Sequence, residues 1–285
     1  MGKIVEYETI KIQEREDGIS IITFNRPNRL NAINFQFVED LQHYLNTLEN
    51  NLKIRVVILT GEGRAFCSGF DLKEGQVIFQ ENGAEVDQKI EYLHLKDQIK
   101  RAIIIQKVIS QLMLKLRRIP QPVIAAIKGI AYGGGLTFAL ASDIRIAGES
   151  TKFCNAFINI GLSGTDCGSS YWLPRLIGFS RAAEFMYTGR VFDAQEADKI
   201  GFVSKVVPDN EVLNEALVLA KQIITKSPIG IRFTKDALNM NVDAPSLDAA
   251  TKLENRTQVI CINADDALEG VFATLEKRES KYDKW

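Results

Sequence analysis

The sequence predicts an α/β core followed by an all-helical tail. Apolar, β-branched segments alternate with segments of helical periodicity up to about Pro208, and beyond it only helical periodicity remains. Two of the apolar segments are also followed by glycine-rich turns, which are called glycine corners below. Because alternating strands and helices are typical of an α/β fold, we expect a core over residues 1–208 and a helical tail over residues 209–285.

Strands are indicated by runs of β-branched and aromatic residues that are bounded by turn signals. The clearest turn signal is Asp17-Gly18, which predicts a hairpin. The predicted strands are 9–12, 19–24, 56–60, 123–127, 143–146 and 152–154.

Helices are indicated by apolar residues that recur every three or four positions. Asn34 is a predicted N-cap, and Pro120 with Pro122 ends a long helix. Residues 74–94 are polar and irregular, which predicts a mobile lid or insert. The apolar faces of the tail helices predict subunit contacts. The predicted helices are 34–48, 95–118 and 136–141, and in the tail 210–226, 228–240, 246–262 and 264–280.

The composition is that of a globular protein with a large core, since 46% of the 285 residues are hydrophobic and 25% are charged. A net charge of -1 gives no general attraction to nucleic acid or to acidic membranes. The longest uncharged apolar stretch, 129–142, is too short for a membrane span. Four cysteines without C-x-x-C spacing and only two histidines predict neither a metal site nor a disulfide framework. No targeting segment is evident, so we expect a cytoplasmic protein.

The two glycine corners are the candidate functional features. Residues 65–72 (AFCSGFDL) follow the apolar run 56–59, and residues 129–136 (GIAYGGGL) follow the run 123–127. Glycines at a strand-to-helix turn leave backbone N–H groups unpaired and let a ligand approach them. The alternative is that the glycines only permit close packing. Two corners of the same construction favour an oxyanion hole, in which two N–H groups stabilise one developing oxyanion.

Ordered motifs over nearly the whole chain resemble the enoyl-CoA hydratase/isomerase (crotonase) superfamily. The opening motif is Asn25-Arg26-Pro27-Asn28-Arg29-Leu30-Asn31-Ala32, and the glycine corners match its two oxyanion segments. The remaining motifs are 173–178 (LPRLIG), 194–197 (AQEA), 200–203 (IGFV), 227–228 (SP) and 276–278 (EKR).

This resemblance implies a crotonase-like spiral of ββα units with a C-terminal helical trimerisation region. It also implies an acyl-CoA substrate, a homotrimer or hexamer, and no cofactor other than the coenzyme A of the substrate thioester. Carried over by position, the oxyanion donors are the N–H groups of Phe70 and Gly134. The residues implied in coenzyme A binding are Arg29, Phe70, Asp71, Leu72, Lys73, Gly134 and, from the tail, Lys277.

Departures from the family pattern bear on the chemistry. Hydratases of the family use two glutamates, and their positions are occupied here by Thr137 and Phe157. Asp166 matches the position of a proton-transferring aspartate in dienoyl-CoA isomerases, and roughly that of a nucleophilic aspartate in chlorobenzoyl-CoA dehalogenases. The dehalogenases' supporting histidine and tryptophan are replaced by Ser110 and Ile158.

The resemblance favours an isomerase or hydratase that acts on an unsaturated, cyclic or aromatic acyl-CoA through an enolate, with Asp166 as acid and base. A hydrolase or dehalogenase with Asp166 as nucleophile is one alternative. A non-catalytic acyl-CoA carrier is another, since both glutamates are replaced. Asp166 could also simply cap the helix that Cys167-Gly168-Ser169-Ser170 begins.

Overall fold

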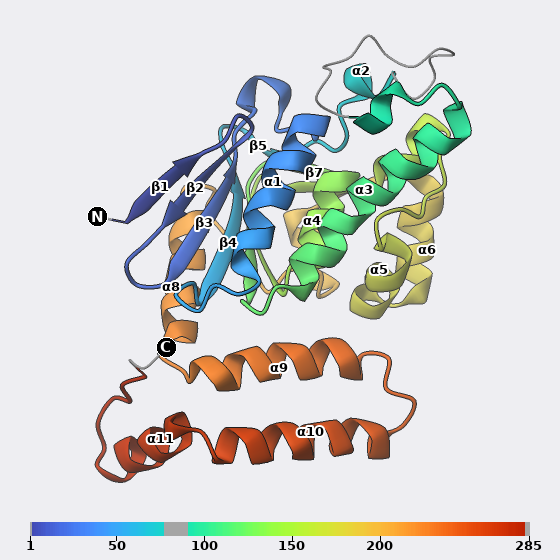
Figure 1. Cartoon of the computed structure of the whole chain (residues 1–285). Coiled ribbons are helices and arrows are strands. Elements are labelled where there is room, and N and C mark those ends of the chain that lie inside the picture. The colour runs from blue at the N-terminus through green and yellow to red at the C-terminus, as the bar shows by residue number, and fades with distance from the viewer. Residues whose placement is uncertain (1, 77–90, 283–285) are drawn as a thin grey trace.

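Two β-sheets lie at the centre of the computed structural model, which describes residues 2–76 and 91–282 (Figure 1). Over these ranges, the larger sheet has the strand order β1-β2-β3-β4-β6-β8-β11 and the smaller sheet has the order β10-β9-β7-β5. Most of the predicted insert, residues 77–90, lies outside the described ranges. The strands are β1 Lys3–Glu6, β2 Ile10–Glu14, β3 Ile19–Phe24, β4 Val56–Gly61, β5 Ala65–Cys67, β6 Val123–Ile127, β7 Ile130–Tyr132, β8 Ile144–Gly148, β9 Lys152–Cys154, β10 Val191–Asp193 and β11 Lys205–Val207.

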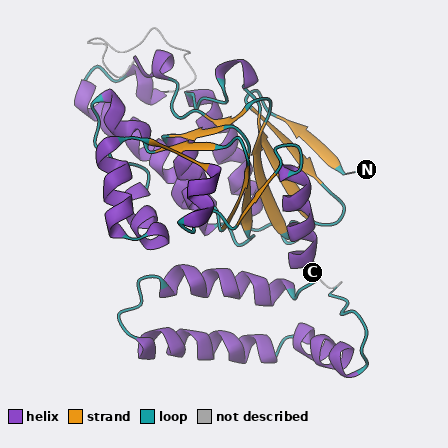
Figure 2. Cartoon of the chain, turned by 180° about the vertical axis from the view of Figure 1, so that it is seen from behind, coloured by secondary structure: helices purple, strands orange, loops and turns teal. Residues whose placement is uncertain are grey.

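The helices surround these sheets and continue into a separate layer at the C-terminal end (Figure 2). None of those in the described part is long and apolar enough to cross a lipid bilayer. The α-helices are α1 Phe35–Leu48, α2 Leu72–Gly75, α3 Gln98–Arg118, α4 Gly134–Ala141, α5 Ser169–Ile177, α6 Phe179–Thr188, α7 Ala194–Lys199, α8 Val212–Ile224, α9 Pro228–Asn241, α10 Leu247–Ile262 and α11 Asp265–Leu275; short 3-10 helices span Pro27–Arg29, Glu91–His94 and Ala156–Ile160.

The larger sheet begins with antiparallel strands and continues with parallel ones. The predicted Asp17-Gly18 hairpin joins β2 to β3, with Gly18 at a φ of 84°. From β3 onward, each neighbour through β4, β6, β8 and β11 is parallel. A parallel neighbour requires a long crossover connection, and the helices lie in these crossovers.

The crossovers that leave β4, β6 and β8 repeat one pattern, in which a strand of the larger sheet is followed by a strand of the smaller sheet and then by a helix. The pattern is clearest in β6, β7 and α4, and it recurs with β4 and β5 before α2 and with β8 and β9 before α5. The predicted spiral of ββα units is therefore confirmed. Its consequence is that the same corner, from the small sheet into a helix, recurs at neighbouring places.

Helices bury both faces of the larger sheet, which explains why its central strands β4 and β6 carry the apolar runs 56–59 and 123–127. On one face, Ile22 and Leu59 join the main core with Phe37 and Leu41 of α1. On the other face, Val212, Ala216 and Ala220 of α8 pack on alternate strand residues. Figures 1 and 2 show α1 and α8 on opposite sides of the sheet. The segment after Pro208 thus begins with a helix of the core, and the boundary at residue 208 stays a prediction.

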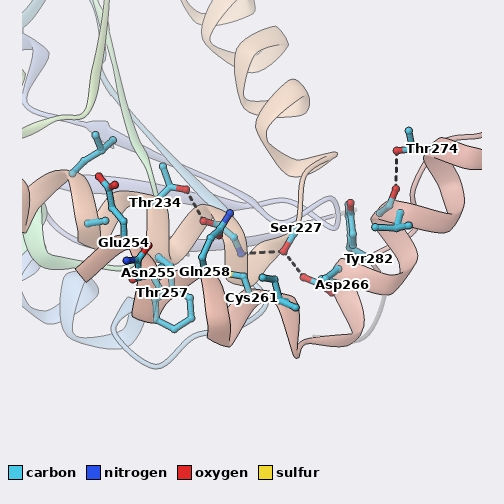
Figure 3. Close-up of a pocket in the computed structure, with 18 of the residues that line it drawn as sticks. Ser227, Thr234, Glu254, Asn255, Thr257, Gln258, Cys261, Asp266, Thr274 and Tyr282 are labelled. Atoms are coloured by element: carbon cyan, nitrogen blue, oxygen red, sulfur yellow. Dashed lines mark hydrogen bonds between the residues drawn. The ribbon is translucent and has the colours of Figure 1, made fainter. Parts of the chain in front are cut away.

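Helices α9, α10 and α11 form a layer beyond α8, at the opposite end of the molecule from α2 (Figure 1). A buried ion pair anchors this layer, because Lys235 Nζ of α9 lies 3.0 Å from Asp143 Oδ2 and donates to Gln121 O at 2.7 Å. A cavity of about 1000 Å³ opens between α9, α10 and α11, lined by residues such as Ser227, Gln258 and Tyr282 (Figure 3). The cavity lies in the tail and is separate from the glycine corners.

Candidate active site

The two glycine corners lie next to each other because β5 and β7 are parallel neighbours in the smaller sheet. Cys67 pairs with Ala131, and each strand then runs into its corner in the same direction. Gly69 has a φ of 98° and Gly133 a φ of 51°, a backbone conformation that favours glycine. The spiral of ββα units therefore brings together two segments that are more than sixty residues apart.

The two glycine corners lie so close together that only glycine fits at the positions where they touch. A Cβ atom on Gly69 would lie 3.6 Å from the backbone nitrogen of Gly134 and 3.0 Å from Tyr132 O. A Cβ atom on Gly135 would lie only 2.1 Å from Cys67 O. The packing explanation for these glycines is thus correct, and it is the same packing that brings the two corners into contact.

Backbone pairing fixes the direction of the Phe70 N–H group. Ile33 N donates to Gly69 O and Asp71 N donates to Ile33 O, both at 2.8 Å, which makes a parallel bridge between Ile33 and Phe70. In such a bridge the flanking residues bond the partner, so the N–H of Phe70 points to the opposite edge. The segment that continues β7 into Gly134 lies along that edge.

Gly134 supplies the second N–H group because it is the first residue of α4. Its N–H belongs to the first helical turn, which has no intrahelical acceptor, whereas Thr137 N already donates to Gly133 O at 3.0 Å. The partial positive charge of a helix N-terminus adds to the same place. Phe70 and Gly134 are thus neighbouring N–H donors and candidates for an oxyanion hole.

The two positions that carry glutamates in hydratases of the resembling family hold no acid–base group here. Thr137 is completely buried, and its hydroxyl donates to Gly134 O at 2.8 Å. Phe157 is half-buried and borders the second corner, since a Cβ atom on Gly133 would lie 3.7 Å from its Cε1. The surroundings of the N–H pair are therefore apolar on this side.

Asp166 lies half-buried in the loop before α5 and does not cap that helix. The N-cap residue of α5 is Gly168, without a side-chain cap. The Asp166 carboxylate instead accepts a hydrogen bond from Cys167 N at 2.6 Å and one from the Gln106 side chain of α3, both through Oδ1. One oxygen is held by two donors, which orients the carboxylate.

The loop that carries Asp166 is joined to the second corner. Asn155 follows β9 and donates through Nδ2 to Gly164 O at 2.6 Å, and Leu162 N donates to Phe157 O at 3.2 Å. Helix α5, which follows the loop, packs against α4. Asp166 and the Gly134 corner thus belong to one packed unit.

The residues implied in coenzyme A binding lie in two places: most are at or near the glycine corners, and Lys277 is in the tail. Arg29 and Lys73 are exposed, and they lie on the two segments that the Ile33–Phe70 bridge joins. Leu72 is also exposed, whereas the Asp71 side chain is buried, accepting from Lys73 N and Arg26. Lys277 follows α11, in the tail layer and away from α2 (Figure 1). Within one chain the structure does not bring Lys277 to the corners.

The residues at the positions of the dehalogenases' histidine and tryptophan, Ser110 and Ile158, do not assist Asp166 as a nucleophile. Ser110 donates to Lys107 O within α3 at 3.0 Å, and Ile158 is partly exposed. The nearby thiols are also poor nucleophiles, because burial raises the pKa of Cys67 to about 12 and raises the pKa of Cys167 further. Asp166 is thus the acid–base candidate of this region within the described residues.

Sequence reasoning missed two polar residues of the site. Gln106 binds Asp166, and Arg26 binds Asp71 and Glu74. Gln106 lies on the exposed side of a long helix, where a glutamine carries no signal. Arg26 lies inside the opening motif beside Pro27, so its position could have drawn attention, but its partners are more than forty residues away.

Comparison with known proteins agrees with this geometry. Residues 14–284 match the model of the enoyl-CoA hydratase/isomerase family. The chain belongs to this family. It is 39% identical over 261 residues to the probable enoyl-CoA hydratase echA12 of Mycobacterium leprae, covering 91% of this chain and 85% of that protein. It is 34% identical over 267 residues to the 1,2-epoxyphenylacetyl-CoA isomerase of Escherichia coli, covering 94% and 95%.

A solved structure extends the likeness to three dimensions. The probable enoyl-CoA hydratase/isomerase from Mycobacterium abscessus has a TM-score of 0.86 and 34% identity, with 97% of this chain and 99% of that chain covered. The fold of this enoyl-CoA hydratase/isomerase family member is therefore the crotonase fold, as the motifs predicted.

Proposed function

We propose that this protein is an acyl-CoA enzyme that binds the thioester oxygen between the N–H groups of Phe70 and Gly134. The observation that carries the proposal is the close contact between the two glycine corners, in which the N–H group of Gly134 lies beside the segment that carries the Phe70 N–H group. Neutral, fixed donors stabilise an oxyanion more than a ground-state carbonyl. Loss of a proton next to the thioester then gives an enolate whose charge rests on that oxygen.

Asp166 moves the proton in this proposal. Its Oδ1 is engaged by Gln106 and Cys167 N, which leaves Oδ2 to take a proton from one carbon of the acyl chain and return it to another. A single carboxylate suits an isomerisation, in which one group serves both steps. Hydration by two glutamates is not available, because Thr137 and Phe157 occupy their positions.

The names of the relatives support this range of reactions. One relative is named an isomerase of a ring-bearing acyl-CoA and another a probable enoyl-CoA hydratase. The half-buried ring of Phe157 beside Gly133 favours a flat, unsaturated, cyclic or aromatic acyl group over a straight saturated one. We therefore propose an isomerase first and a hydratase that uses Asp166 second.

The remainder of the substrate is coenzyme A, and no further cofactor enters the proposal. Arg29 and Lys73 are exposed cations beside the first corner, where they suit phosphate groups. Lys277 serves the same purpose only when a tail from another copy approaches the site. This role depends on assembly into a trimer or hexamer.

The test compares Asp166→Asn with Asp17→Asn, which alters an exposed aspartate of the β2–β3 hairpin. Binding is followed by thermal shift, and turnover by product analysis and release of free thiol, with straight, dienoyl and ring-bearing acyl-CoAs. We expect Asp166→Asn to lower kcat by about 10²–10⁴-fold and Asp17→Asn to leave it unchanged.

Each alternative has a distinct result. A carrier binds acyl-CoAs without turning over any of them, and a hydrolase with Asp166 as nucleophile releases free coenzyme A thiol. Turnover without thiol release that survives Asp166→Asn would remove Asp166 from the mechanism.

A further inference from the structure

The first glycine corner is held by a turn from an earlier part of the chain, residues 26–34. Ser68 N donates to Leu30 O at 3.0 Å, and Asn31 Nδ2 donates to Ala65 O at 2.7 Å. Together with the two bonds between Ile33 and the residues around Phe70, these contacts join the turn to the corner along its whole length. The direction of the Phe70 N–H therefore depends on the conformation of this turn.

The turn has an unfavourable backbone conformation that surrounding contacts must maintain. Leu30 and Asn31 have φ values of 51° and 55°, in the left-handed region that glycine adopts freely, asparagine adopts more readily than most residues, and leucine adopts only with strain. Residues without glycine's freedom cost on the order of 1 kcal/mol or more each in this region. The buried side chain of Asn31 accounts for part of the support, since its Oδ1 also accepts from Arg26 N at 2.9 Å.

Arg26 joins both sides of the corner through one guanidinium group. Its Nη1 donates to Ala32 O at 2.5 Å, next to the bridging residue Ile33. Its Nη2 donates to Asp71 Oδ2 at 3.1 Å and to Glu74 Oε1 at 3.3 Å. Asp71 directly follows Phe70, and Glu74 lies in α2. The side chains of Arg26 and Asp71 are only 16% and 10% exposed, so this ion pair is shielded from water.

The network continues to the helix that follows the turn. Asn34 Nδ2 donates to Glu74 Oε1 at 3.0 Å, while its Oδ1 accepts from Phe37 N as the N-cap of α1. Asp71 in turn accepts from Lys73 N as the N-cap of α2. Arg26 thus contacts the cap of α2 directly through Asp71 and the cap of α1 indirectly, through Glu74 and Asn34.

We propose that Arg26 is a positioning residue that fixes the oxyanion donor Phe70 by bridging Ala32 O, Asp71 and Glu74. The proposal rests on the proposed function, in which Phe70 N–H binds the thioester oxygen. A planar guanidinium reaches three acceptors with fixed geometry, whereas a lysine ammonium is a single point of charge. Without Arg26, the Asp71 carboxylate is left partly buried without its cation, and the peptide between Gly69 and Asp71 loses its brace.

The test measures carbonyl polarisation directly, with the coenzyme A thioester of 4-dimethylaminocinnamic acid as the probe. The long-wavelength absorption of this donor–acceptor chromophore moves to the red when hydrogen bonds polarise its thioester carbonyl. Wild type is compared with Arg26→Gln and Arg26→Lys. The matched control is Arg15→Gln, which removes the exposed ion pair with Asp17 in the β2–β3 hairpin.

We expect the bound probe to shift to the red in wild type and in Arg15→Gln. In Arg26→Gln the probe still binds, but the red shift falls to roughly half or less because one donor is displaced. Arg26→Lys gives an intermediate shift. If Arg26→Gln does not fold, Arg26→Lys decides the matter by the same measurement.

A full wild-type red shift in the folded Arg26 variants would overturn the positioning role while leaving the proposed function intact. A wild-type protein that gives no red shift would instead overturn the oxyanion assignment, and the role of Arg26 with it. The two failures are therefore distinguishable.

Discussion

At individual residues, the chemistry of the site depends on Thr137 and Phe157, which occupy the positions of the two glutamates of hydratases. Thr137 directs its hydroxyl at Gly134 O and is inaccessible, and Phe157 presents a ring edge to Gly133. Neither residue holds water or exchanges its protons. The N–H pair survives these replacements because it is made of backbone, whereas the acid–base groups are side chains that change freely.

We therefore predict that the protein hydrates crotonyl-CoA poorly. Acid–base groups contribute about 10²–10⁴-fold each, and Asp166 can replace only one of the two glutamates. The measurement is the initial rate of crotonyl-CoA hydration beside the rates with dienoyl and ring-bearing thioesters. Efficient crotonyl-CoA hydration that persists in Asp166→Ala would mean that the catalytic groups lie elsewhere.

The backbone part of the site could be predicted from the sequence, and the side-chain network could not. Gly69 and Gly134 could be recognised because each lies in a glycine-containing turn that follows an apolar, strand-like run. The bonds from Gln106 to Asp166 and from Arg26 to Asp71 link residues that are far apart in the sequence. No local pattern predicts such pairs, because each depends on the packing of separate elements.

Among the elements, prediction succeeded for the long helices and for most strands of the larger sheet, and it failed for most of the short strands. Strands β3, β6 and β9 and the tail helix α10 lie within one or two residues of their predicted bounds, and Asn34 is the N-cap of α1 as predicted. Strands β1, β5, β7, β10 and β11 were missed. Each has only three or four residues, too few to show alternation, and each exists because a neighbour offers pairing partners.

The link between α9 and the core gives a prediction at this level. Lys235 and Asp143 are mostly buried, and Asp143 also pairs with Arg117 at 2.8 Å. Lys235→Met should lower the free energy of unfolding by about 2–3 kcal/mol, somewhat less than the loss of a whole buried pair because Arg117 remains. Chemical denaturation measures the change.

The control for this prediction is Lys252→Met, which removes an exposed pair with Asp248 on α10. An exposed pair contributes little, so the control should change stability by about 0.5 kcal/mol or less. Equal effects of the two variants would show that the buried pair does not anchor the tail.

For the molecule as a whole, the tail layer is the feature that exposes large apolar side chains. Leu238, Ile262 and Leu275 are each more than 60% exposed, and they border the cavity between α9, α10 and α11. Exposed apolar side chains gathered in one region mark an interaction surface. The sequence predicted the helices of this layer well, and their contact with other copies of the chain stays a prediction.

We predict a trimer, or a dimer of trimers, built through the tail. Sedimentation velocity at micromolar concentration should give a single species of three or six chains, and Leu275→Glu should shift it toward smaller species. A monomer in wild type at that concentration would refute this assembly. It would also remove the proposed role of Lys277 at the coenzyme A phosphates.

The oxyanion assignment is tested most directly by a pair of substitutions at Gly134. Alanine and proline both add a Cβ atom, which meets the flexible end of Ile33 at 2.6 Å, but only proline removes the N–H group. Proline is tolerated at the first position of a helix, so α4 should remain intact. The measurement is kcat of both variants on the best acyl-CoA of the turnover panel.

We expect Gly134→Pro to lower kcat by about 10²–10³-fold relative to Gly134→Ala, because only proline removes an oxyanion donor while both variants carry the added Cβ atom. Equal kcat values for the two folded variants would show that the Gly134 N–H does not bind the reacting oxygen.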